Sequence, residues 1–464
     1  MLPIRVGDCL RQPGKALHER ERASVDMLDV IGIGIGPFNL SLAALIEPTP
    51  LRARFLEKCE GFCWHPGLAL PNSRLQVSPL KDCVTLVDPT SPYSFLNYLA
   101  RHGRLYSFVN KRNASTSRRE FTDYYRWVAR RLGTLRFAEE VVDVAPFSDG
   151  YRVNTTTTTY LARAVVIGVG VEPKIPECAR ALIGNTVYHA ADYLERNPPY
   201  VGEHVLVVGG GQSGAEIVEH MFNRPLATRI TWVTSRTNLF AMDDNSFVNE
   251  AYMPGYSRRF HALPLQQRRA IVEHEKLTSD GISAELCNRL YDMLYERSVE
   301  GTLVDSFRLL SSVVLKDITS HNKRWRVDLN GITTQRDHSI IVDRIVLATG
   351  FQPRTPPFLQ TLLGGARMED GLPVLGPDYA VRFDQHMPGP VFLQNQSRLQ
   401  HGLQSVNLSL VAYRNSLIIN SLLGQSFYLD TSDRQILDSY DNSDTSELGA
   451  LDVMPSTQHM AAIT

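Results

Sequence analysis

Residues Asp29–Asn39 read DVIGIGIGPFN, and this glycine-rich stretch indicates the fold class. An apolar run leads directly into three closely spaced glycines, and the proline that follows them favours the first turn of a helix. A glycine-rich turn between a strand and a helix lets backbone N–H groups meet a pyrophosphate at the positive end of the helix. The stretch therefore predicts a dinucleotide site in a Rossmann-like unit. Its candidate cofactor-binding residues are Gly32, Gly34, Gly36, Pro37 and Asn39.

A short apolar strand over Ala53–Glu57 follows this turn at the distance expected for the second strand of the same unit. The strand ends in an acidic residue, Glu57. In dinucleotide-binding folds an acid at this place binds the ribose hydroxyl of the adenosine. Glu57 therefore favours a nucleotide without a 2′-phosphate at the first site.

A second glycine-rich turn lies about 180 residues further along, where Val205–Glu216 reads VLVVGGGQSGAE. Two such turns, each led in by an apolar strand, predict two dinucleotides. The candidate binding residues of this turn are Gly209, Gly211, Gln212, Ser213 and Gly214. For Ser213 the alternative is a cap on the following helix.

The next strand after the second turn, Ile230–Val233, ends without an acid, and Arg236 follows it closely. A guanidinium group at this place suits a 2′-phosphate, so the second nucleotide is predicted to be NADPH. The alternative for Arg236 is a solvated surface arginine. Opposite charges at the two strand ends argue against a chance repetition of the motif.

Length and composition narrow the class of protein. A chain of 464 residues exceeds the size at which one core stops growing, so two or three domains are expected. The formal net charge of −1 and the lack of basic runs argue against a nucleic-acid partner. No apolar run reaches the ~18 residues of a membrane span, and the six cysteines are scattered, so a cytoplasmic protein with reduced thiols is expected.

The predicted fold class is α/β, with two nested Rossmann-like dinucleotide-binding domains and a smaller, mostly helical substrate domain. The chain is expected to re-enter its first domain at a strand over Arg344–Leu347, which closes on a Thr-Gly turn. The expected segments are a disordered extension at 1–26, the first domain at 27–196 and 344–429, the second domain at 197–240 and 307–343, the helical insertion at 241–306, and a polar tail at 430–464.

A long stretch at 61–92 is rich in proline, glycine and polar residues. It is too long for a simple connection between two elements, so it is predicted to carry function. Amphipathic helices are expected after it, over Tyr93–Arg101 and Arg119–Leu132.

The order of several motifs over residues 27–425 resembles one family, the flavin-dependent N-hydroxylating monooxygenases of siderophore biosynthesis, which includes lysine N6-hydroxylases and ornithine N5-hydroxylases. Each tripeptide alone is weak evidence, but the combination is specific. The motifs are Gly32–Leu40, Trp64–Gly67, Gln76–Asp82, Asp88–Leu99, Gly209–Gly214, Ala348–Phe351, and His401–Leu403 with Leu408–Ser409.

This resemblance implies FAD and NADPH as cofactors, a primary amine and molecular oxygen as substrates, and a homotetramer. NADPH would reduce FAD, oxygen would add to give a C4a-hydroperoxyflavin, and a neutral side-chain amine would attack the distal oxygen. The product would be an N-hydroxylamine destined for a hydroxamate siderophore. The first candidate substrate is L-lysine, giving N6-hydroxylysine, with L-ornithine, putrescine, cadaverine and histamine as alternatives.

The resemblance also assigns roles around the flavin. Gln76 would lie beside the isoalloxazine ring, and Ser213 near both the flavin and the NADP pyrophosphate, so these two are the candidate catalytic residues. The alternative for Gln76 is a loop amide. Trp64 and His65 would cover the flavin or form a buried structural pair. Further cofactor contacts are expected from Thr349, Gly350, Asn407 and Ser409.

Three residues are candidates for substrate binding. Lys81 matches the family lysine that pairs with the substrate α-carboxylate, with a salt bridge to Asp82 as the alternative. Asn249 matches a substrate-contacting asparagine. Where ornithine enzymes carry an Asn-Tyr pair, this chain has Leu277–Ile282, which resembles the lysine and diamine branch; Asp280 within it would hold an ammonium group or form a plain turn.

Two other classes of protein are alternatives to the monooxygenase: a pyridine-nucleotide disulfide reductase and a flavin-binding protein without catalysis. A pyridine-nucleotide disulfide reductase needs a redox cysteine pair with four residues between, but Cys59 and Cys63 have three between them. The same cysteines with His65 lack a fourth ligand, so no metal site is predicted. A flavin-binding protein without catalysis would not need Gln76 and Lys81. No residue could be named as the base that deprotonates the amine.

Overall fold

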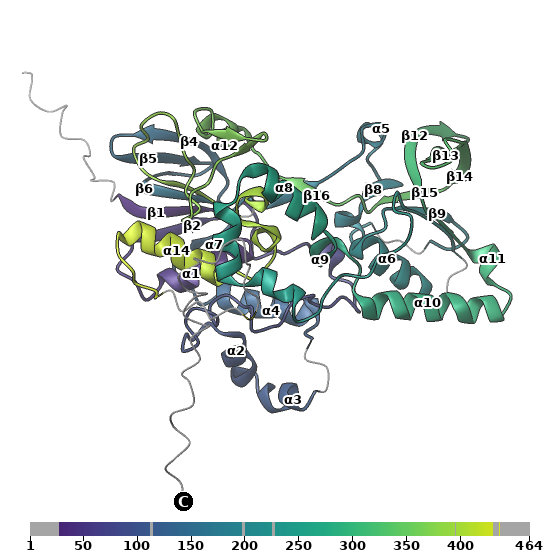
Figure 1. Ribbon diagram of the computed structural model, residues 1–464, viewed down its shortest axis with the longest axis horizontal. Helices are drawn as coiled ribbons and strands as arrows, with labels where there is room; N and C mark the ends of the chain where they lie inside the picture. Colours follow the sequence, from purple (N-terminus) through teal and green to yellow (C-terminus); the bar gives the residue numbers. More distant parts are fainter. Residues whose placement is uncertain are drawn as a thin grey trace, which may run out of the picture.

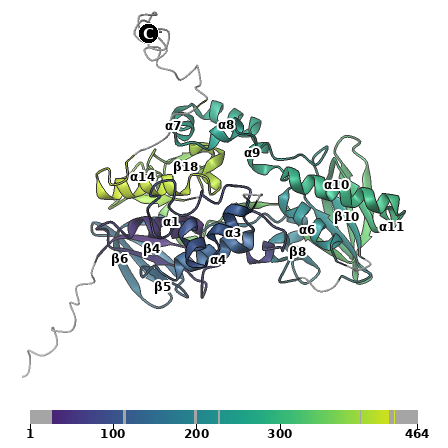
Figure 2. The ribbon, with the colours of Figure 1, turned by 90° about the horizontal axis from the view of Figure 1, so that it is seen from below.

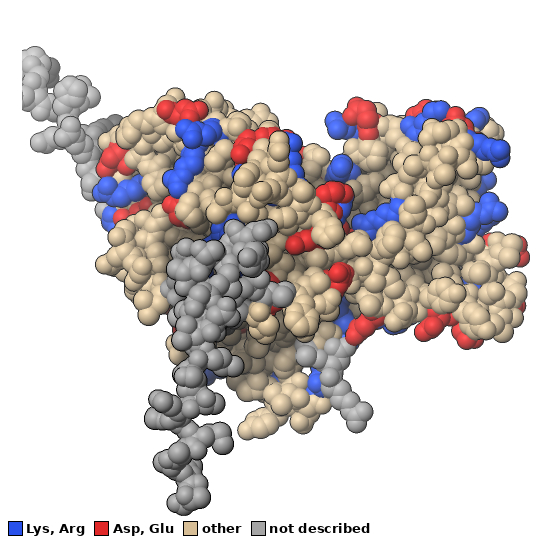
Figure 3. Space-filling model, viewed as in Figure 1, with Lys and Arg blue, Asp and Glu red and all other residues tan. Residues whose placement is uncertain are grey.

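The computed structural model describes residues 27–111, 115–196, 200–224, 228–394, 396–429 and 436. The extension expected at 1–26 and the tail expected at 430–464, apart from residue 436, lie outside them. The described chain forms two lobes, each built on its own sheet (Figure 1). Lysine, arginine and acidic side chains are interspersed over the face drawn in Figure 3, which is hollowed between the lobes.

The first lobe contains a seven-stranded sheet in the order β3-β2-β1-β6-β5-β4, with β19 alongside the end of β6. Strands β3, β2, β1, β6 and β19 run parallel, and β4 and β5 add an antiparallel hairpin. The strands are β1 (Leu28–Ile33), β2 (Ala53–Leu56), β3 (Leu135–Arg136), β4 (Val141–Phe147), β5 (Gly150–Thr155), β6 (Thr159–Ile167) and β19 (Val391–Leu393). The apolar residues of β1 are buried, as expected of a central parallel strand.

Helices cover this sheet. Helix α1 (Pro37–Ile46) follows the first glycine turn and packs against α14 (Val411–Leu423) and α4 (Arg118–Ala129). Nine of the ten residues of α1 are buried, which explains its nearly uniform apolar sequence. Helices α2 (Phe95–Arg101) and α3 (Leu105–Asn110) lie beneath α4 (Figure 1), so both predicted amphipathic helices are present.

The second lobe contains a five-stranded, fully parallel sheet in the order β11-β10-β9-β15-β8. These strands are β8 (Val187–His189), β9 (His204–Val208), β10 (Arg229–Val233), β11 (Phe307–Leu310) and β15 (Arg344–Leu347). Helix α6 (Gln212–Phe222) follows β9 after the second glycine turn. A separate antiparallel sheet of β12 (Val313–His321), β13 (Arg324–Gly331) and β14 (Asp337–Val342) extends this lobe.

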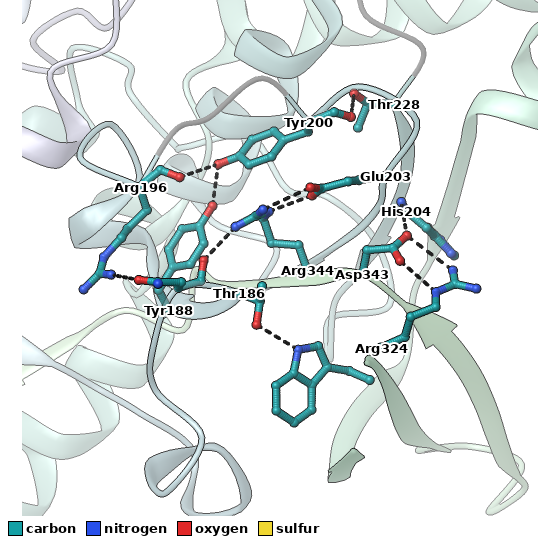
Figure 4. A network of polar contacts seen from close by, with 12 residues as sticks. Thr186, Tyr188, Arg196, Tyr200, Glu203, His204, Thr228, Arg324, Asp343 and Arg344 are labelled. Carbon is teal, nitrogen blue, oxygen red and sulfur yellow. Dashed lines mark hydrogen bonds and ion pairs between the residues drawn. The ribbon is translucent and has the colours of Figure 1, made fainter. Parts of the chain in front are cut away.

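The expected domain boundaries at 196 and 344 need correction, because β8 and β15 both belong to the second sheet. The buried side chain of Arg344 fixes β15 there (Figure 4). Its guanidinium donates to both carboxylate oxygens of Glu203 at 2.8 and 3.1 Å and to the Asn185 carbonyl at 2.6 Å. The chain therefore crosses between the lobes before β8 and after β15. The antiparallel pair β7 (Val171–Pro173) and β16 (Phe351–Pro353) joins these two crossovers.

The helical insertion does not form a core of its own among the described residues. Helices α7 (Pro254–Ala262) and α8 (Leu265–His274) pack on α13 (Arg398–His401) of the first lobe, whereas α10 (Ala284–Val299) packs on α6 (Figure 2). Leu286 and Leu290 of α10 are buried in the same cluster as Trp232 of the second sheet. The insertion thus bridges the two lobes.

The remaining elements are short. They are η1 (Pro66–Leu68), α5 (Glu177–Arg180), η2 (Ala190–Asp192), η3 (Val248–Tyr252), α9 (Leu277–Asp280), α11 (Leu303–Ser306), α12 (Pro357–Leu362), β17 (Met368–Glu369), β18 (Leu372–Pro373) and η4 (Leu403–Val406). Within the described ranges, no helix combines the length and the apolar character that a membrane crossing requires.

Candidate functional site

A cavity of about 1630 Å³ lies between the lobes and is lined by both of them. Its walls come from the first glycine turn, the end of β2, the start of α6, the helical insertion and residues 406–409. The proline- and glycine-rich stretch at 61–92 supplies residues 63–66, 72, 74–79 and 81 of the lining. The predicted site residues on this lining are Gly34, Gly36, Pro37, Glu57, Trp64, His65, Gln76, Lys81, Gln212, Asn249, Asp280, Asn407 and Ser409.

The first glycine turn is built so that two of its glycines are required by packing. A Cβ on Gly32 would lie 2.1 Å from the Phe55 ring, and one on Gly34 would lie 2.4 Å from the Gly168 carbonyl oxygen. Gly34 also has a φ of +86°, which favours glycine. Gly36 differs: it precedes α1 and has open space where a side chain would project, on the cavity side.

Glu57 and Asn39 hold this turn in different ways. The Glu57 carboxylate lines the cavity and accepts hydrogen bonds from the Ile35 N–H at 2.8 Å and the Cys59 N–H at 3.0 Å. Asn39 is fully buried, and its amide donates to the Gly34 carbonyl at 2.8 Å. Asn39 lies off the cavity lining and positions the turn through this bond, and its predicted contact with a cofactor stays a prediction.

The second turn repeats the design of the first. Gly209 has a φ of +127°, and its Cβ would lie 2.1 Å from the Ala348 carbonyl oxygen. A Cβ on Gly214 would lie 2.3 Å from the Gly209 carbonyl oxygen. That oxygen accepts a hydrogen bond from the Trp232 indole at 2.7 Å. Gly211, which precedes α6, again has open space around its Cβ position.

Gln212 and Ser213 begin α6 and have different surroundings. Gln212 lines the cavity, donates to Glu216 at 2.9 Å and accepts from the Ser283 N–H at 2.9 Å, which ties the second turn to the helical insertion. Ser213 lies off the cavity lining. The alternative in which Ser213 caps the helix is wrong, because Gly211 occupies the cap position and no side-chain cap bond is made.

Arg236 lies just beyond β10 and is partly buried, so the reading as a solvated surface arginine is wrong. Its Nη2 donates to the Asp280 carbonyl at 2.9 Å. Its Nη1 is buried and has no hydrogen-bond partner among the described residues. An unsatisfied buried guanidinium nitrogen is costly, and an incoming anion would satisfy it.

Thr349 and Gly350 lie on the crossover between the lobes and off the cavity lining. The Thr349 hydroxyl donates to the Lys174 carbonyl at 2.5 Å. The Gly350 carbonyl accepts from the His189 ring at 2.9 Å and from the Lys174 N–H at 2.9 Å. These contacts hold the two crossovers together, and the predicted cofactor contacts of both residues stay predictions.

Trp64 and His65 cover one wall of the cavity together with Arg118, which sequence analysis missed. The Arg118 guanidinium lies 4.7 Å from the centre of the Trp64 ring, a cation–π geometry. Its Nε is buried without a hydrogen-bond partner among the described residues, and burial lowers the pKa of this guanidinium. Nothing in the sequence marks Arg118, because it begins an ordinary amphipathic helix.

His65 predicts a specific pH dependence of stability. Burial, with Arg118 nearby, lowers the pKa of His65 from 6.5 to about 4. Between these values the unfolded chain binds a proton that the folded chain does not, so stability falls as the pH drops below 6.5. His65→Asn tolerates the left-handed backbone (φ 46°) and cannot titrate. We expect it to reduce the loss of unfolding free energy between pH 7 and pH 4.5 by about 2 kcal/mol in urea titrations; an unchanged loss would show that His65 does not cause it.

Asn407 and Ser409 lie beside Lys81, and Gln76 lines the same cavity. Gln76 is exposed to the cavity and makes no hydrogen bond with the described chain. Asn407 accepts from the Ser409 N–H at 2.8 Å. The Ser409 hydroxyl, 2% exposed, accepts from the Lys81 ammonium at 3.1 Å.

Lys81 is partly buried in the cavity wall, and this burial lowers its pKa. It lies 5.3 Å from the centre of the Tyr252 ring. The alternative salt bridge to Asp82 is wrong, because the Asp82 carboxylate is buried and accepts from the Val84, Thr85 and Phe95 N–H groups at 2.6–2.9 Å. Among the described residues Lys81 has no ion-pair partner, which leaves its charge available to a ligand.

The helical insertion brings Asn249 and Asp280 to the same end of the cavity. The Asn249 amide donates to Asp244 at 2.9 Å, a cavity-lining carboxylate that sequence analysis did not single out. Asp280 is already paired: Arg398 lies 3.4 Å from its carboxylate, and Ser279 donates to it at 2.8 Å. Asp280 also lines the cavity, and its predicted role in holding a substrate ammonium stays a prediction.

Residues 26–353 match the family model described as L-lysine 6-monooxygenase/L-ornithine 5-monooxygenase. The chain belongs to this family. The matched residues include both glycine turns, the cavity-lining loop and the whole helical insertion. The family predicted from the order of the motifs is therefore confirmed.

Relatives of this monooxygenase act on different amines. It is 33% identical over 407 residues to the L-lysine N6-monooxygenase of Escherichia coli, covering 86% of this chain and 96% of that protein. It matches the FAD-bound cadaverine monooxygenase of the desferrioxamine pathway from Erwinia amylovora with a TM-score of 0.83 and 30% identity, over 89% and 98% of the two chains. For the Kutzneria sp. 744 ornithine N-hydroxylase the values are 0.81 and 29%, over 86% and 99%.

These solved relatives bear on the predicted fold and cofactors. The Erwinia enzyme was solved with FAD, and the Kutzneria enzyme with reduced FAD, NADP⁺ and L-ornithine. The predicted α/β class with two Rossmann-like units and the predicted pair FAD and NADPH are confirmed for the family. The amine differs between relatives, so similarity alone does not choose among lysine, ornithine and a diamine.

Proposed function

We propose that this protein uses FAD, NADPH and molecular oxygen to hydroxylate the side-chain amine of L-lysine, giving N6-hydroxylysine for a hydroxamate siderophore. The family supports amine N-hydroxylation. The observation that favours an amino acid is the partly buried Lys81 ammonium on the wall of the cavity. It has no carboxylate partner among the described residues.

The first glycine turn fits FAD. Gly36 leaves open space at the start of α1, where backbone N–H groups can bind a pyrophosphate. Glu57 lies beside this turn at the end of β2, where a carboxylate can accept from ribose hydroxyls. FAD in this place would extend its ring system along the wall formed by Trp64 and His65, and Gln76 would offer an uncharged hydrogen-bonding group.

The second turn fits NADPH. Gly211 leaves the start of α6 open, and Gln212 faces the cavity from the same turn. The buried, unpartnered Nη1 of Arg236 would be satisfied by a 2′-phosphate. When bound, the two cofactors supply the reducing electrons and the activation of oxygen.

The residues of the chain bind, orient and desolvate the amine. A lysine side chain has an unperturbed pKa of about 10.4 and must be neutral to react as a nucleophile. Burial of the side-chain amine in the cavity would disfavour its charged form through desolvation. No described residue is assigned as the base, and water can accept the proton.

The test of the substrate is a hydroxylamine assay of wild type and Lys81→Met with L-lysine and cadaverine. Cadaverine is lysine without its carboxylate. Because the variant leaves the carboxylate without its cation, we expect the KM for L-lysine to rise about 100-fold, equal to about 2.7 kcal/mol. The KM for cadaverine should change by less than about twofold. Equal effects on both amines would contradict a carboxylate at Lys81.

The preference for lysine over the alternative amines, the oligomeric state and the location of the protein stay predictions. L-ornithine is shorter than lysine by one methylene, and a site matched to lysine discriminates against it by about 10-fold or more. Putrescine, cadaverine and histamine carry no carboxylate for Lys81. The resemblance implies a homotetramer, which size-exclusion chromatography with light scattering would test, and action in the cytoplasm stays an expectation from the sequence alone.

A further inference from the structure

We propose that Asp244 binds the α-ammonium group of the substrate, opposite the carboxylate that Lys81 holds. This inference rests on the proposed amine hydroxylation but not on lysine being the amine. It assigns a second polar contact at the end of the cavity that lies away from the reacting nitrogen.

The backbone around Asp244 is held firmly. The segment before it runs beside residues 277–282: the Met242 N–H donates to the Ile282 carbonyl at 2.6 Å, and the Ile282 N–H donates to the Phe240 carbonyl at 3.0 Å. The two strands of chain pass so closely that a Cβ on Gly281 would lie 2.3 Å from the Cα of Met242. Backbone hydrogen bonds therefore anchor the segment that leads to Asp244.

The two adjacent acids Asp243 and Asp244 have different surroundings. Asn245 accepts from the N–H groups of Phe247 and Val248 at 3.1 and 3.0 Å and so holds the start of η3. Its amide donates to Asp243 at 3.0 Å, which keeps that carboxylate in the local turn. Asp244 lines the cavity, whereas Asp243 does not.

Asp244 has acceptor capacity to spare. Its Oδ1 accepts from the Asn249 amide at 2.9 Å, and no other hydrogen bond to it is made within the described residues. Asn249 orients the carboxylate without neutralising its charge. A carboxylate held by one neutral donor retains lone pairs that can accept from an ammonium group.

Asp244 and Lys81 lie near each other but do not form an ion pair. Both residues line the same cavity, and the negative charge of Asp244 raises the pKa of Lys81 against the lowering effect of burial. No salt bridge within 4.0 Å joins them. A cation and an anion at one end of a cavity, with space between, complement a zwitterionic head group in which the carboxylate and the ammonium share one carbon.

The other acid near this end cannot take this role as readily. The Asp280 carboxylate pairs with Arg398 and accepts from Ser279, so its charge is already balanced. Binding an ammonium there would require Arg398 to move. Asp244 has no such cationic partner among the described residues.

Three amines distinguish the contribution of the Asp244 charge from that of the Lys81 charge. L-Lysine carries both the carboxylate and the α-ammonium group. Cadaverine keeps the same five-carbon spacing between its two nitrogens but lacks the carboxylate, and 6-aminohexanoate keeps the carboxylate but lacks the α-ammonium. Asp244 should therefore matter for lysine and cadaverine, and Lys81 for lysine and 6-aminohexanoate.

The experiment measures the affinity of the FAD-loaded enzyme for the three amines by isothermal titration calorimetry, with KM measured beside it. We expect Asp244→Asn to weaken lysine and cadaverine at least tenfold and to leave 6-aminohexanoate within about twofold. Asn is nearly isosteric and keeps an oxygen for Asn249. Lys81→Met should give the complementary pattern. Asp243→Asn, one residue away and off the cavity, is the matched control and should change none of the three.

The outcomes distinguish the two proposals. If wild type binds and hydroxylates cadaverine but not lysine, the proposed substrate is wrong, while the cadaverine arm still decides the role of Asp244. Unchanged affinity of Asp244→Asn for both ammonium-bearing amines overturns the inference, as does an equal loss for all three amines in a variant with normal flavin content and melting temperature. Failure of wild type to bind either ammonium-bearing amine overturns it as well.

Discussion

Replacing Gly36 with valine should give a folded protein that purifies without flavin. The backbone at Gly36 has φ −85° and ψ −177°, which any residue adopts, and no atom lies within 4 Å of an added Cβ. A valine therefore costs the fold little. Its methyl groups would fill the space at the start of α1 where the pyrophosphate of FAD is proposed to lie, and the loss of that contact should remove nearly all bound flavin.

The measurement is the visible flavin absorbance per mole of purified protein, with circular dichroism to show that the chain is folded. Gly133→Val is the matched control, because Gly133 also has open space around its Cβ but lies away from the cavity. The control should retain flavin fully. A Gly36→Val variant that retained FAD at wild-type occupancy would show that the first turn does not bind this cofactor.

Gly211→Val should separate the two nucleotide sites. Gly211 precedes α6 in an extended backbone, φ −105° and ψ −175°, and again has nothing within 4 Å of its Cβ position. We expect the variant to bind FAD normally, because the first turn is untouched. Reduction of its flavin by NADPH should slow about 100-fold or more, since the nicotinamide would lose the anchor that positions it.

Stopped-flow absorbance under anaerobic conditions measures this rate, and dithionite provides the control. Dithionite needs no nucleotide site, so it should reduce wild type and Gly211→Val equally. Wild-type reduction by NADPH in the variant would place the nicotinamide nucleotide elsewhere. Together the two valine variants test whether each glycine turn serves its own dinucleotide.

The features that the sequence predicted well are those that local chemistry determines. Positive φ angles at Gly34 and Gly209 admit little besides glycine, so these turns are visible in the sequence itself. The strand that follows each turn places Glu57 and Arg236 at fixed distances along the chain. The buried apolar runs of β1 and β9 were equally plain.

The features that the sequence did not predict depend on contacts between distant segments. β15 joins the second sheet because Arg344 pairs with Glu203, 141 residues away, and no local pattern announces that pairing. Asp280 pairs with Arg398, 118 residues away, and no local pattern indicates that ion pair. Arg118 and Asp244 became candidates only when folding placed them on the cavity wall.

Amine N-hydroxylation by this protein is tested by measuring how tightly NADPH oxidation is coupled to product formation. The FAD-loaded enzyme is incubated with NADPH, oxygen and L-lysine, and N6-hydroxylysine, hydrogen peroxide and consumed NADPH are measured together. We predict nearly one hydroxylated lysine for each NADPH, with little peroxide. NADPH oxidation that gives only hydrogen peroxide with lysine, ornithine and each diamine would contradict amine N-hydroxylation by this chain.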